Sequence, residues 1–357
     1  MSVYKKILEY GRTLERGTPQ TYGDKLAFKT IDLHTGGEPL RVIMNGFPEP
    51  KGKSVLEYRH FYREFYDQFR KLLMFEPRGH ADMYGCILTP PNDTSGDFGV
   101  VFMHNEGYST MCGHAIIALA ILAYEMGWVE NTRMGPLKID APCGRIETHI
   151  DKQGGRVLGA RFRGVPSFAI DLDKSVDIPE LGSVSYDLAY GGAFYAYVDR
   201  ERNDFELELV PSGCRDLIDL GMRIKEAVAN QGPPVHPFEP DLSFLYGTIF
   251  IGPSKYTGID SRNVCVFADR EVDRSPTGSG VSGRMALHRA RNEINPGETM
   301  RIESITGSVF TGSVVEDVTY GPYKAVIPEV AGSAFITGFH TFVLDPNDPL
   351  STGFILR

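Results

Sequence analysis

Two short motifs place a reactive side chain, followed by glycine, where a helix is predicted to begin. The first, Met111-Cys112-Gly113-His114, leads into an apolar run over residues 115–123. The second begins 165 residues after Cys112 as Thr277-Gly278-Ser279-Gly280 and leads into residues 281–287. The first turn of a helix has free backbone N–H groups that bind anions. Two such helix starts facing each other would put a thiol and a hydroxyl on either side of one small anion.

Cys112 is the candidate base of the pair. The helix dipole and the free N–H groups at a helix start favour a thiolate and lower the pKa of a cysteine. Gly113 lets a ligand approach the backbone closely, and His114 adds a polar side chain beside the thiol. An isolated free cysteine is more often a small buried apolar residue. The context of Cys112 and its counterpart at Thr277 favour the catalytic interpretation.

The second motif belongs to the segment 273–280, which is rich in turn-forming residues and hydrogen-bond donors. Pro276 is well suited to a helix start because the first N–H groups of a helix are unpaired in any case. Gly278 and Ser279 offer backbone N–H groups to a carboxylate. Asp273 is a candidate to hold a substrate ammonium group, with a helix cap or a local salt bridge as the structural alternative.

A dinucleotide-binding oxidoreductase is the first alternative. Gly278, Gly280 and Gly283 satisfy the G-x-G-x-x-G pattern, with Glu303 twenty residues beyond the last Gly. That fingerprint requires its first glycine directly after a strand, whereas the preceding predicted strand ends near Ala268. It also leaves the motif around Cys112 unexplained, so the alternative is the weaker one.

The composition is typical of a globular protein with two cores. The 357 residues are 42% hydrophobic and 23% charged, and the net charge is −9, which argues against nucleic acid or an anionic membrane as a partner. No stretch approaches the roughly 18 apolar residues of a membrane span, and the N-terminus lacks a signal-peptide core. The five cysteines are widely spaced without C-x-x-C, which favours reduced thiols in the cytoplasm and no metal site.

The order of predicted elements indicates two α/β domains of similar design, each around one central helix. The first half has a helix from Cys112 to about Met126 that is apolar nearly all round, and strands over residues 27–35, 39–44, 83–88, 98–104 and 137–150. The second half has helices over 214–230 and from Thr277, and strands over residues 156–162, 185–190, 194–198, 247–251, 263–268 and 299–315. We expect an N-terminal extension over 1–26, a first domain carrying Cys112 over 27–163 plus 342–357, and a second domain carrying Thr277 over 164–341.

Four segments together resemble the proline racemase family, which includes hydroxyproline epimerases and trans-3-hydroxy-L-proline dehydratases. They are residues 32–39, 79–85, 111–114 and 273–280. The resemblance implies an α/β (α+β) fold similar to diaminopimelate epimerase, with two pseudo-symmetric domains, each a curved sheet around a central helix, and an active site in the interdomain cleft. It also implies a small imino acid as substrate and no cofactor, and it is compatible with a homodimer.

By this resemblance, Cys112 is the thiol base at the substrate α-carbon, and Asp273, with or without the His114 side chain, holds the ring nitrogen. The backbone N–H groups expected to bind the substrate carboxylate are those of Gly113, His114, Gly278 and Ser279. Racemases of the family carry a second cysteine where this chain has Thr277. Ser279 also replaces a threonine that is commoner at its position.

The threonine changes the expected chemistry. Inversion of a stereocentre needs a base on one face and an acid on the other, and a threonine hydroxyl is poor at both tasks. In trans-3-hydroxy-L-proline the C3 hydroxyl is on the same ring face as the C2 hydrogen, so Cys112 alone could remove the proton and return it to the departing hydroxyl. We therefore expect a hydro-lyase that dehydrates this substrate to Δ1-pyrroline-2-carboxylate, with Thr277 as a hydrogen-bonding or water-positioning residue. The alternatives are a proline racemase or hydroxyproline epimerase and a non-enzymatic imino-acid-binding protein.

Overall fold

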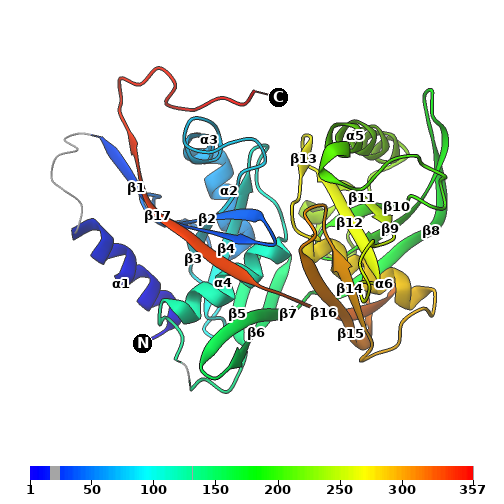
Figure 1. Ribbon diagram of the computed structural model, residues 1–357. Helices are drawn as coiled ribbons and strands as arrows, with labels where there is room; N and C mark the ends of the chain where they lie inside the picture. Colours follow the sequence, from blue (N-terminus) through cyan, green and yellow to red (C-terminus); the bar gives the residue numbers. More distant parts are fainter. Residues whose placement is uncertain (17–24, 131, 357) are drawn as a thin grey trace. The chain divides into compact units, whose positions relative to one another are not determined.

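The computed structural model describes residues 1–16, 25–130 and 132–356 (Figure 1). Its contacts divide the chain into two compact units. The first comprises Met1–Thr110, Ala115–Ala160 and Ser333–Arg357, and the second comprises Met111–His114 and Arg161–Gly332. The predicted domains had boundaries at 163/164 and 341/342 and placed Cys112 in the first domain. They remain a prediction and are not identified with these two units.

The first unit contains a mixed sheet with the strand order β17-β1-β2-β3-β4-β5-β6. The β2/β3 and β4/β5 pairs are parallel, and the other pairs are antiparallel. The strands are β1 (Leu26–Thr35), β2 (Glu38–Asn45), β3 (Tyr84–Thr89), β4 (Phe98–His104), β5 (Leu137–Ala141), β6 (Gly144–Gln153) and β17 (Ala334–Leu344). The predicted turn between β1 and β2 is confirmed, since Gly36 and Gly37 both have positive φ, where glycine is favoured.

Helix α4 (Gly113–Glu125) is the central helix predicted after Cys112. Every residue from Ala115 to Ala123 is buried, as expected for a helix that is apolar on all sides. Three further helices of this unit were not predicted from the sequence: α1 (Val3–Arg16), α2 (Val55–Phe65) and α3 (Asp67–Met74). Helices α2 and α3 bury Tyr62, Leu72 and Leu73 in a core shared with Phe28.

The predicted N-terminal extension is helical where it is described. Helix α1 contacts β2 and buries Val3 and Ile7. Residues 17–24 of the extension lie outside the described residues. None of the helices in the described part of the chain combines the length and hydropathy that a membrane crossing needs.

The second unit contains a closed ring of eight strands. Its order is β8-β9-β10-β11-β12-β14-β15-β16, and β16 pairs with β8 to complete the ring. The strands are β8 (Ser167–Ile178), β9 (Gly182–Tyr190), β10 (Phe194–Asp199), β11 (Leu245–Gly252), β12 (Ser261–Phe267), β14 (Thr299–Glu303), β15 (Val309–Tyr320) and β16 (Tyr323–Gly332). Closure leaves no free edge among these strands.

The remaining elements flank the ring or connect its strands. The short strand β13 (Glu271–Val272) pairs with β12, and β7 (Arg156–Arg163) spans the division between the units. Helix α5 (Cys214–Asn230) covers the same residues as predicted and contacts β8, β11 and β12. Two 3-10 turns lie at Pro211–Gly213 and Pro240–Leu242.

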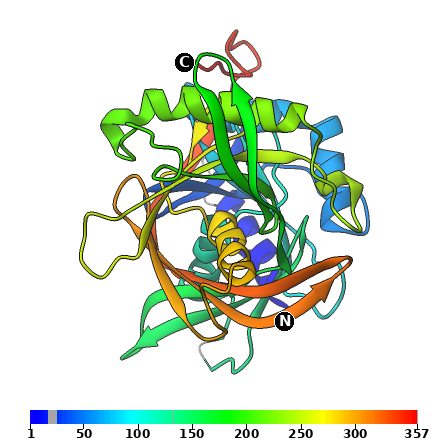
Figure 2. The same ribbon diagram turned by 90° about the vertical axis from the view of Figure 1, so that its right-hand side faces the viewer.

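The ring encloses helix α6 (Gly278–Ala290), the helix predicted after Thr277 (Figure 2). Helix α6 contacts β8, β9, β15 and β16 and is buried from Gly278 to Leu287. A Cβ atom at Gly280 would meet Ile249, and one at Gly283 would meet Tyr197. Packing inside the ring therefore accounts for two of the three glycines that fit the dinucleotide fingerprint.

The predicted strands are confirmed with ends shifted by a few residues, but β8, β13, β16 and β17 were missed. Only the first residue of β17, Ala334, is buried, and the strand includes the exposed Phe335 and Phe339. A strand with so little burial lacks the alternation on which sequence prediction relies.

The turn between β9 and β10 provides a test of the packing around α6. A Cβ atom at Gly191 would collide with the backbone of Ser279 and of Gly283. We expect Gly191→Ala to lower the free energy of unfolding by about 3 kcal/mol or more, because a rigid helix backbone cannot yield as a side chain can. Urea unfolding measures the change.

The matched control is Gly135→Ala, since no described atom lies within 4 Å of a Cβ built at Gly135. Its stability should stay within about 0.5 kcal/mol of the wild type. Equal stability of the two variants would contradict the packing of the β9–β10 turn against α6.

Candidate active site

The thiol of Cys112 lies beside an imidazole. Cys112 and His114 are 5% and 3% exposed, and Cys112 Sγ is 3.1 Å from His114 Nδ1. Cys112 directly precedes α4, which begins at Gly113, so its position at a helix start is as predicted. A neighbouring imidazole can accept the thiol proton or donate to the thiolate. By contrast, burial alone raises the pKa of the Cys86 thiol well above its usual range, which makes that cysteine inert.

The two glycines of the motifs are in backbone contact within the second unit. A Cβ atom built on Gly278 would lie 2.6 Å from Gly113 Cα and 3.4 Å from the backbone nitrogen of His114. Only two residues without side chains can approach so closely. The structure therefore brings residues 111–114 to the first turn of α6, where Thr277, Gly278 and Ser279 lie.

Thr277 is the N-cap of α6 but does not act as a capping residue. Its φ and ψ are 67° and 95°, and its side chain makes no capping hydrogen bond. An N-cap threonine ordinarily has extended backbone and accepts an N–H hydrogen bond from the first turn, and a positive φ is strained for a β-branched residue. Thr277 Oγ1 is buried and has no hydrogen-bond partner among the described residues.

Asp273 is a buried carboxyl group in the turn before α6. It is 6% exposed, and burial raises its pKa from the usual 3.8 to about 6. Hydrogen bonds from Ser275, including Ser275 N–H to Oδ1 at 2.7 Å, and the nearby Thr277 hydroxyl oppose the rise. A cationic group bound here would favour the ionised carboxylate.

Two tyrosines of β10 hold the first turn of α6, whose backbone N–H groups are the predicted carboxylate-binding groups. Backbone N–H groups in a first turn have no acceptor inside the helix, which applies to Gly278 and Ser279. Tyr195 Oη lies 2.8 Å from Ser279 Oγ, and Tyr197 Oη donates to the Gly280 carbonyl at 2.9 Å. These contacts from β10 fix the first turn in position.

Sequence reasoning missed Ser275, Asn263, Tyr195 and Tyr197 as supports of this site. Asn263 is fully buried and donates from Nδ2 to the Pro276 carbonyl at 3.0 Å. The signal that could have found Asn263 is its amide at the start of the predicted strand 263–268, which is otherwise mostly apolar, since a buried amide requires partners. The tyrosines gave no such signal, because aromatic residues are common in strands. Among the described residues, no group of three or more His, Cys, Asp or Glu side chains is arranged to hold a metal ion.

These features define an α/β protein with two units of one design, each with a buried central helix, and with a thiol before one of these helices and a hydroxyl before the other. The model of the family named Proline racemase matches residues 30–355. The chain therefore belongs to the proline racemase family.

Two relatives and one solved structure show what the chain is similar to. The trans-3-hydroxy-L-proline dehydratase of Colwellia psychrerythraea is 48% identical over 355 residues, which are 99% of each chain. The 3-hydroxyproline 2-epimerase of Burkholderia multivorans is 46% identical over 335 residues, or 93% of this chain and 98% of the relative. The crystal structure of a hydroxyproline epimerase from Agrobacterium vitis with bound trans-4-hydroxy-L-proline has a TM-score of 0.84 at 28% identity, covering 93% of this chain and 96% of that chain.

The raised pKa of Asp273 predicts a pH dependence of stability. The native state binds this proton more tightly than the unfolded state, so the stabilisation is complete below about pH 4 and is lost as pH rises through about 6. We expect Asp273→Asn, which cannot ionise, to gain up to about 3 kcal/mol relative to the wild type between pH 4 and pH 7. Urea unfolding of both proteins at the two pH values measures this shift. A difference that is the same at both would contradict it.

Proposed function

We propose that the protein is a hydro-lyase that dehydrates trans-3-hydroxy-L-proline to Δ1-pyrroline-2-carboxylate without a cofactor. The observation that carries the proposal is the difference between the two helix starts. Cys112 has an imidazole nitrogen 3.1 Å from its sulfur, whereas the buried Thr277 hydroxyl has no hydrogen-bond partner among the described residues. The helix start at Cys112 thus supplies a base, and the helix start at Thr277 supplies only a neutral hydroxyl.

The proposed reaction needs a single base. The Cys112 thiolate takes the C2 proton, the C2 electrons form the C2–C3 double bond, and the C3 hydroxyl leaves. Because the C3 hydroxyl and the C2 hydrogen are on the same ring face, the Cys112 thiol can return the proton to the leaving hydroxyl, which departs as water. The enamine product then tautomerises to the cyclic imine.

The remaining site residues bind the substrate in this proposal. The N–H groups of Gly113, His114, Gly278 and Ser279 hold the carboxylate, and their partial positive charge stabilises the extra electron density after C2 deprotonation. The Asp273 carboxylate holds the ring ammonium of the substrate by an ion pair in the low-dielectric interior. Thr277 Oγ1 is placed to hydrogen-bond the substrate or a water molecule. The placement of this site between two domains, a homodimer and a cytoplasmic location remain predictions.

Epimerisation of 3-hydroxyproline is the second candidate, because one relative of similar identity is named for that activity. It requires a proton donor on the second face of the ring. The residue available there in this proposal is Thr277, whose hydroxyl is a far weaker acid than a thiol. Dehydration is therefore favoured.

Proton NMR in heavy water with trans-3-hydroxy-L-proline tests the proposal. The wild type should consume the C2 and C3 proton signals and form a cyclic imine, and Cys112→Ser should lose at least about 10³-fold in rate while still binding substrate, because a serine hydroxyl is a much weaker base. Cys214→Ser is the matched control, since Cys214 also begins a helix, and it should retain wild-type turnover. C2 exchange with the ring hydroxyl retained would favour the epimerase, and persistent dehydration by Cys112→Ser would overturn the assignment of the base.

Thr277→Cys tests the role of the second helix start. A thiol there supplies an acid on the second face, so we expect the variant to gain C2 epimerisation or proline racemisation, measured by polarimetry or chiral chromatography. Thr277→Ser is the control, because it keeps a hydroxyl and should gain no such activity. An unchanged product spectrum in Thr277→Cys would mean that the missing thiol is not what prevents inversion.

A further inference from the structure

A chain of hydrogen-bonded polar side chains, here called the polar chain, runs along α6 from the buried Thr277 turn to the exposed Glu293 just beyond the other end of the helix. It begins with Asn263 on β12 and continues through Arg284 and His288 to Glu293. Asn263 and Arg284 are 0% and 2% exposed. None of these four residues has a part in the proposed reaction, so the burial of Asn263 and Arg284 requires another explanation.

Arg284 is unusual because its charge is buried without an ion-pair partner. Its Nη1 donates to Ser261 Oγ at 2.8 Å and to Asn263 Oδ1 at 3.0 Å, and its Nη2 lies 3.0 Å from His288 Nε2. No carboxylate of the described residues forms a salt bridge with it, its Nε has no partner among them, and burial lowers its pKa to about 10. The charges of Asp199 and Glu293 offset only part of this effect of burial on the pKa. Burying a charge without a direct ion-pair partner is costly.

The guanidinium determines how Asn263 is oriented. An arginine only donates hydrogen bonds, so the Asn263 atom facing Arg284 must be the carbonyl oxygen. The amide nitrogen must then face the Pro276 carbonyl, which only accepts. Both contacts fix the same amide, and neither allows it to flip.

The Pro276–Thr277 peptide is thereby held at both of its polar atoms. Its carbonyl accepts from Asn263, and its N–H, on Thr277, donates to Ser275 Oγ at 3.1 Å. The next peptide is held by Val281 N–H, which donates to the Thr277 carbonyl at 2.7 Å. With both flanking peptide planes fixed, Thr277 is confined to its strained positive φ, at a cost of about 1–3 kcal/mol that these contacts must offset.

We propose that Asn263, oriented by Arg284, is a positioning residue that holds Thr277 in its left-handed backbone conformation and so aims the Thr277 hydroxyl at the substrate. This proposal rests on the proposed function for its effect on turnover. Its structural part, the dependence of the Thr277 backbone on Asn263, stands independently of the reaction.

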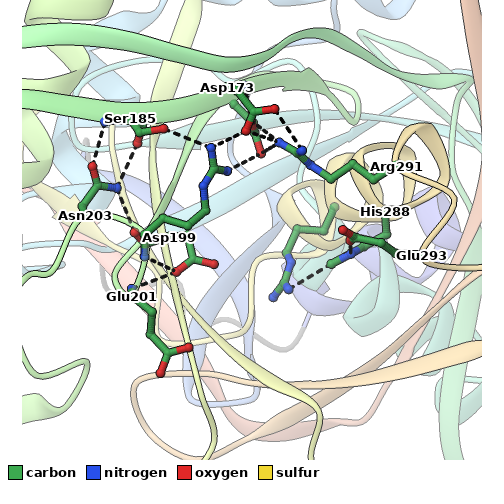
Figure 3. A network of polar contacts seen from close by, with 11 residues as sticks. Asp173, Ser185, Asp199, Glu201, Asn203, His288, Arg291 and Glu293 are labelled. Carbon is green, nitrogen blue, oxygen red and sulfur yellow. Dashed lines mark hydrogen bonds and ion pairs between the residues drawn. The ribbon is translucent and has the colours of Figure 1, made fainter.

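At the end of the polar chain away from Thr277, His288 and Glu293 lie beside a larger network of charged side chains (Figure 3). His288 Nε2 accepts from Arg284, so Nδ1 carries the proton and donates to Glu293 Oε2 at 2.6 Å. Arg291 on the same helix end pairs with Asp173 and Asp187 of β8 and β9. These groups line a cavity of about 190 Å³ together with Arg284. Strands of the ring thus brace the end of α6 opposite to Thr277.

Asn263→Asp tests the hydrogen bond from Asn263 to the Pro276 carbonyl separately from the contact with Arg284. The carboxylate keeps an acceptor for Arg284 and gives it an ion-pair partner, which offsets part of the cost of leaving the Pro276 carbonyl without its donor. It removes the donor to the Pro276 carbonyl, since ionisation is favoured beside a guanidinium. We expect kcat for dehydration to fall at least about tenfold with KM within about threefold, because the Thr277 hydroxyl is displaced while the α6 N–H groups that bind the substrate carboxylate remain.

A second readout does not depend on catalysis. In protein labelled with ¹³C-threonine, the Thr277 resonance, assigned by its loss in Thr277→Ser, reports the Thr277 backbone conformation. Asn263→Asp should move this resonance. Thr248→Val is the matched control, because Thr248 is fully buried in β11 and donates to the Gly221 carbonyl at 2.9 Å, away from the turn; it should leave the resonance and kcat unchanged.

The outcomes separate the two proposals. An unmoved Thr277 resonance in a folded Asn263→Asp protein, or an equal loss of kcat in Thr248→Val, overturns the positioning role. A wild type that does not dehydrate the substrate overturns the proposed function while the resonance still tests the positioning role. If Asn263→Asp does not fold, Arg284→Lys gives the same readouts, because a single ammonium cannot hold Ser261, Asn263 and His288 in the fork geometry of arginine; wild-type kcat and an unmoved resonance there also overturn it.

Discussion

The backbone contact between Gly113 and Gly278 is the constraint on which the candidate site depends. Any side chain at either position would meet the other backbone at or below 2.6 Å, so the two segments would have to separate. The contact holds the residues beside Cys112 against the first turn of α6. The carboxylate-binding N–H groups inferred from the resemblance come from both segments, which makes their proximity a precondition for binding one carboxylate.

Burial then sets the chemistry of the groups around this contact. Removal from water raises the pKa of Asp273 to about 6 and lowers that of Arg284 to about 10, so each group is less readily charged than in solvent. Both lie in the unit whose closed ring surrounds α6, where hydrogen bonds must be supplied by the protein. Ser275 supplies them to Asp273, and Asn263 and Ser261 supply them to Arg284. The ring thus provides both the desolvation and the partners that make it tolerable.

The two units explain why the motifs are alike and why their difference matters. Each unit has a sheet and a buried central helix, α4 in one and α6 in the other. Cys112 directly precedes α4, and Thr277 directly precedes α6. By the resemblance to racemases of the family, Thr277 stands where those proteins carry a thiol, so an acid is missing at this helix start in our proposal. In our proposal, a hydrogen-bonding role at that position suits elimination from one ring face.

Local patterns in the sequence determined much of this protein. Glycine placement and hydrophobic periodicity depend only on residues that are close in sequence. They predict the turn at Gly36 and Gly37, most strands, the uniformly apolar α4, and the helix starts after Cys112 and Thr277. The tertiary structure alone decided the closure of the ring by β16 with β8, the positive φ of Thr277, and the chain through Asn263 and Arg284. Each of these depends on groups far apart in sequence whose hydrogen bonds and close contacts form only when the strands assemble, and no local propensity encodes such partners.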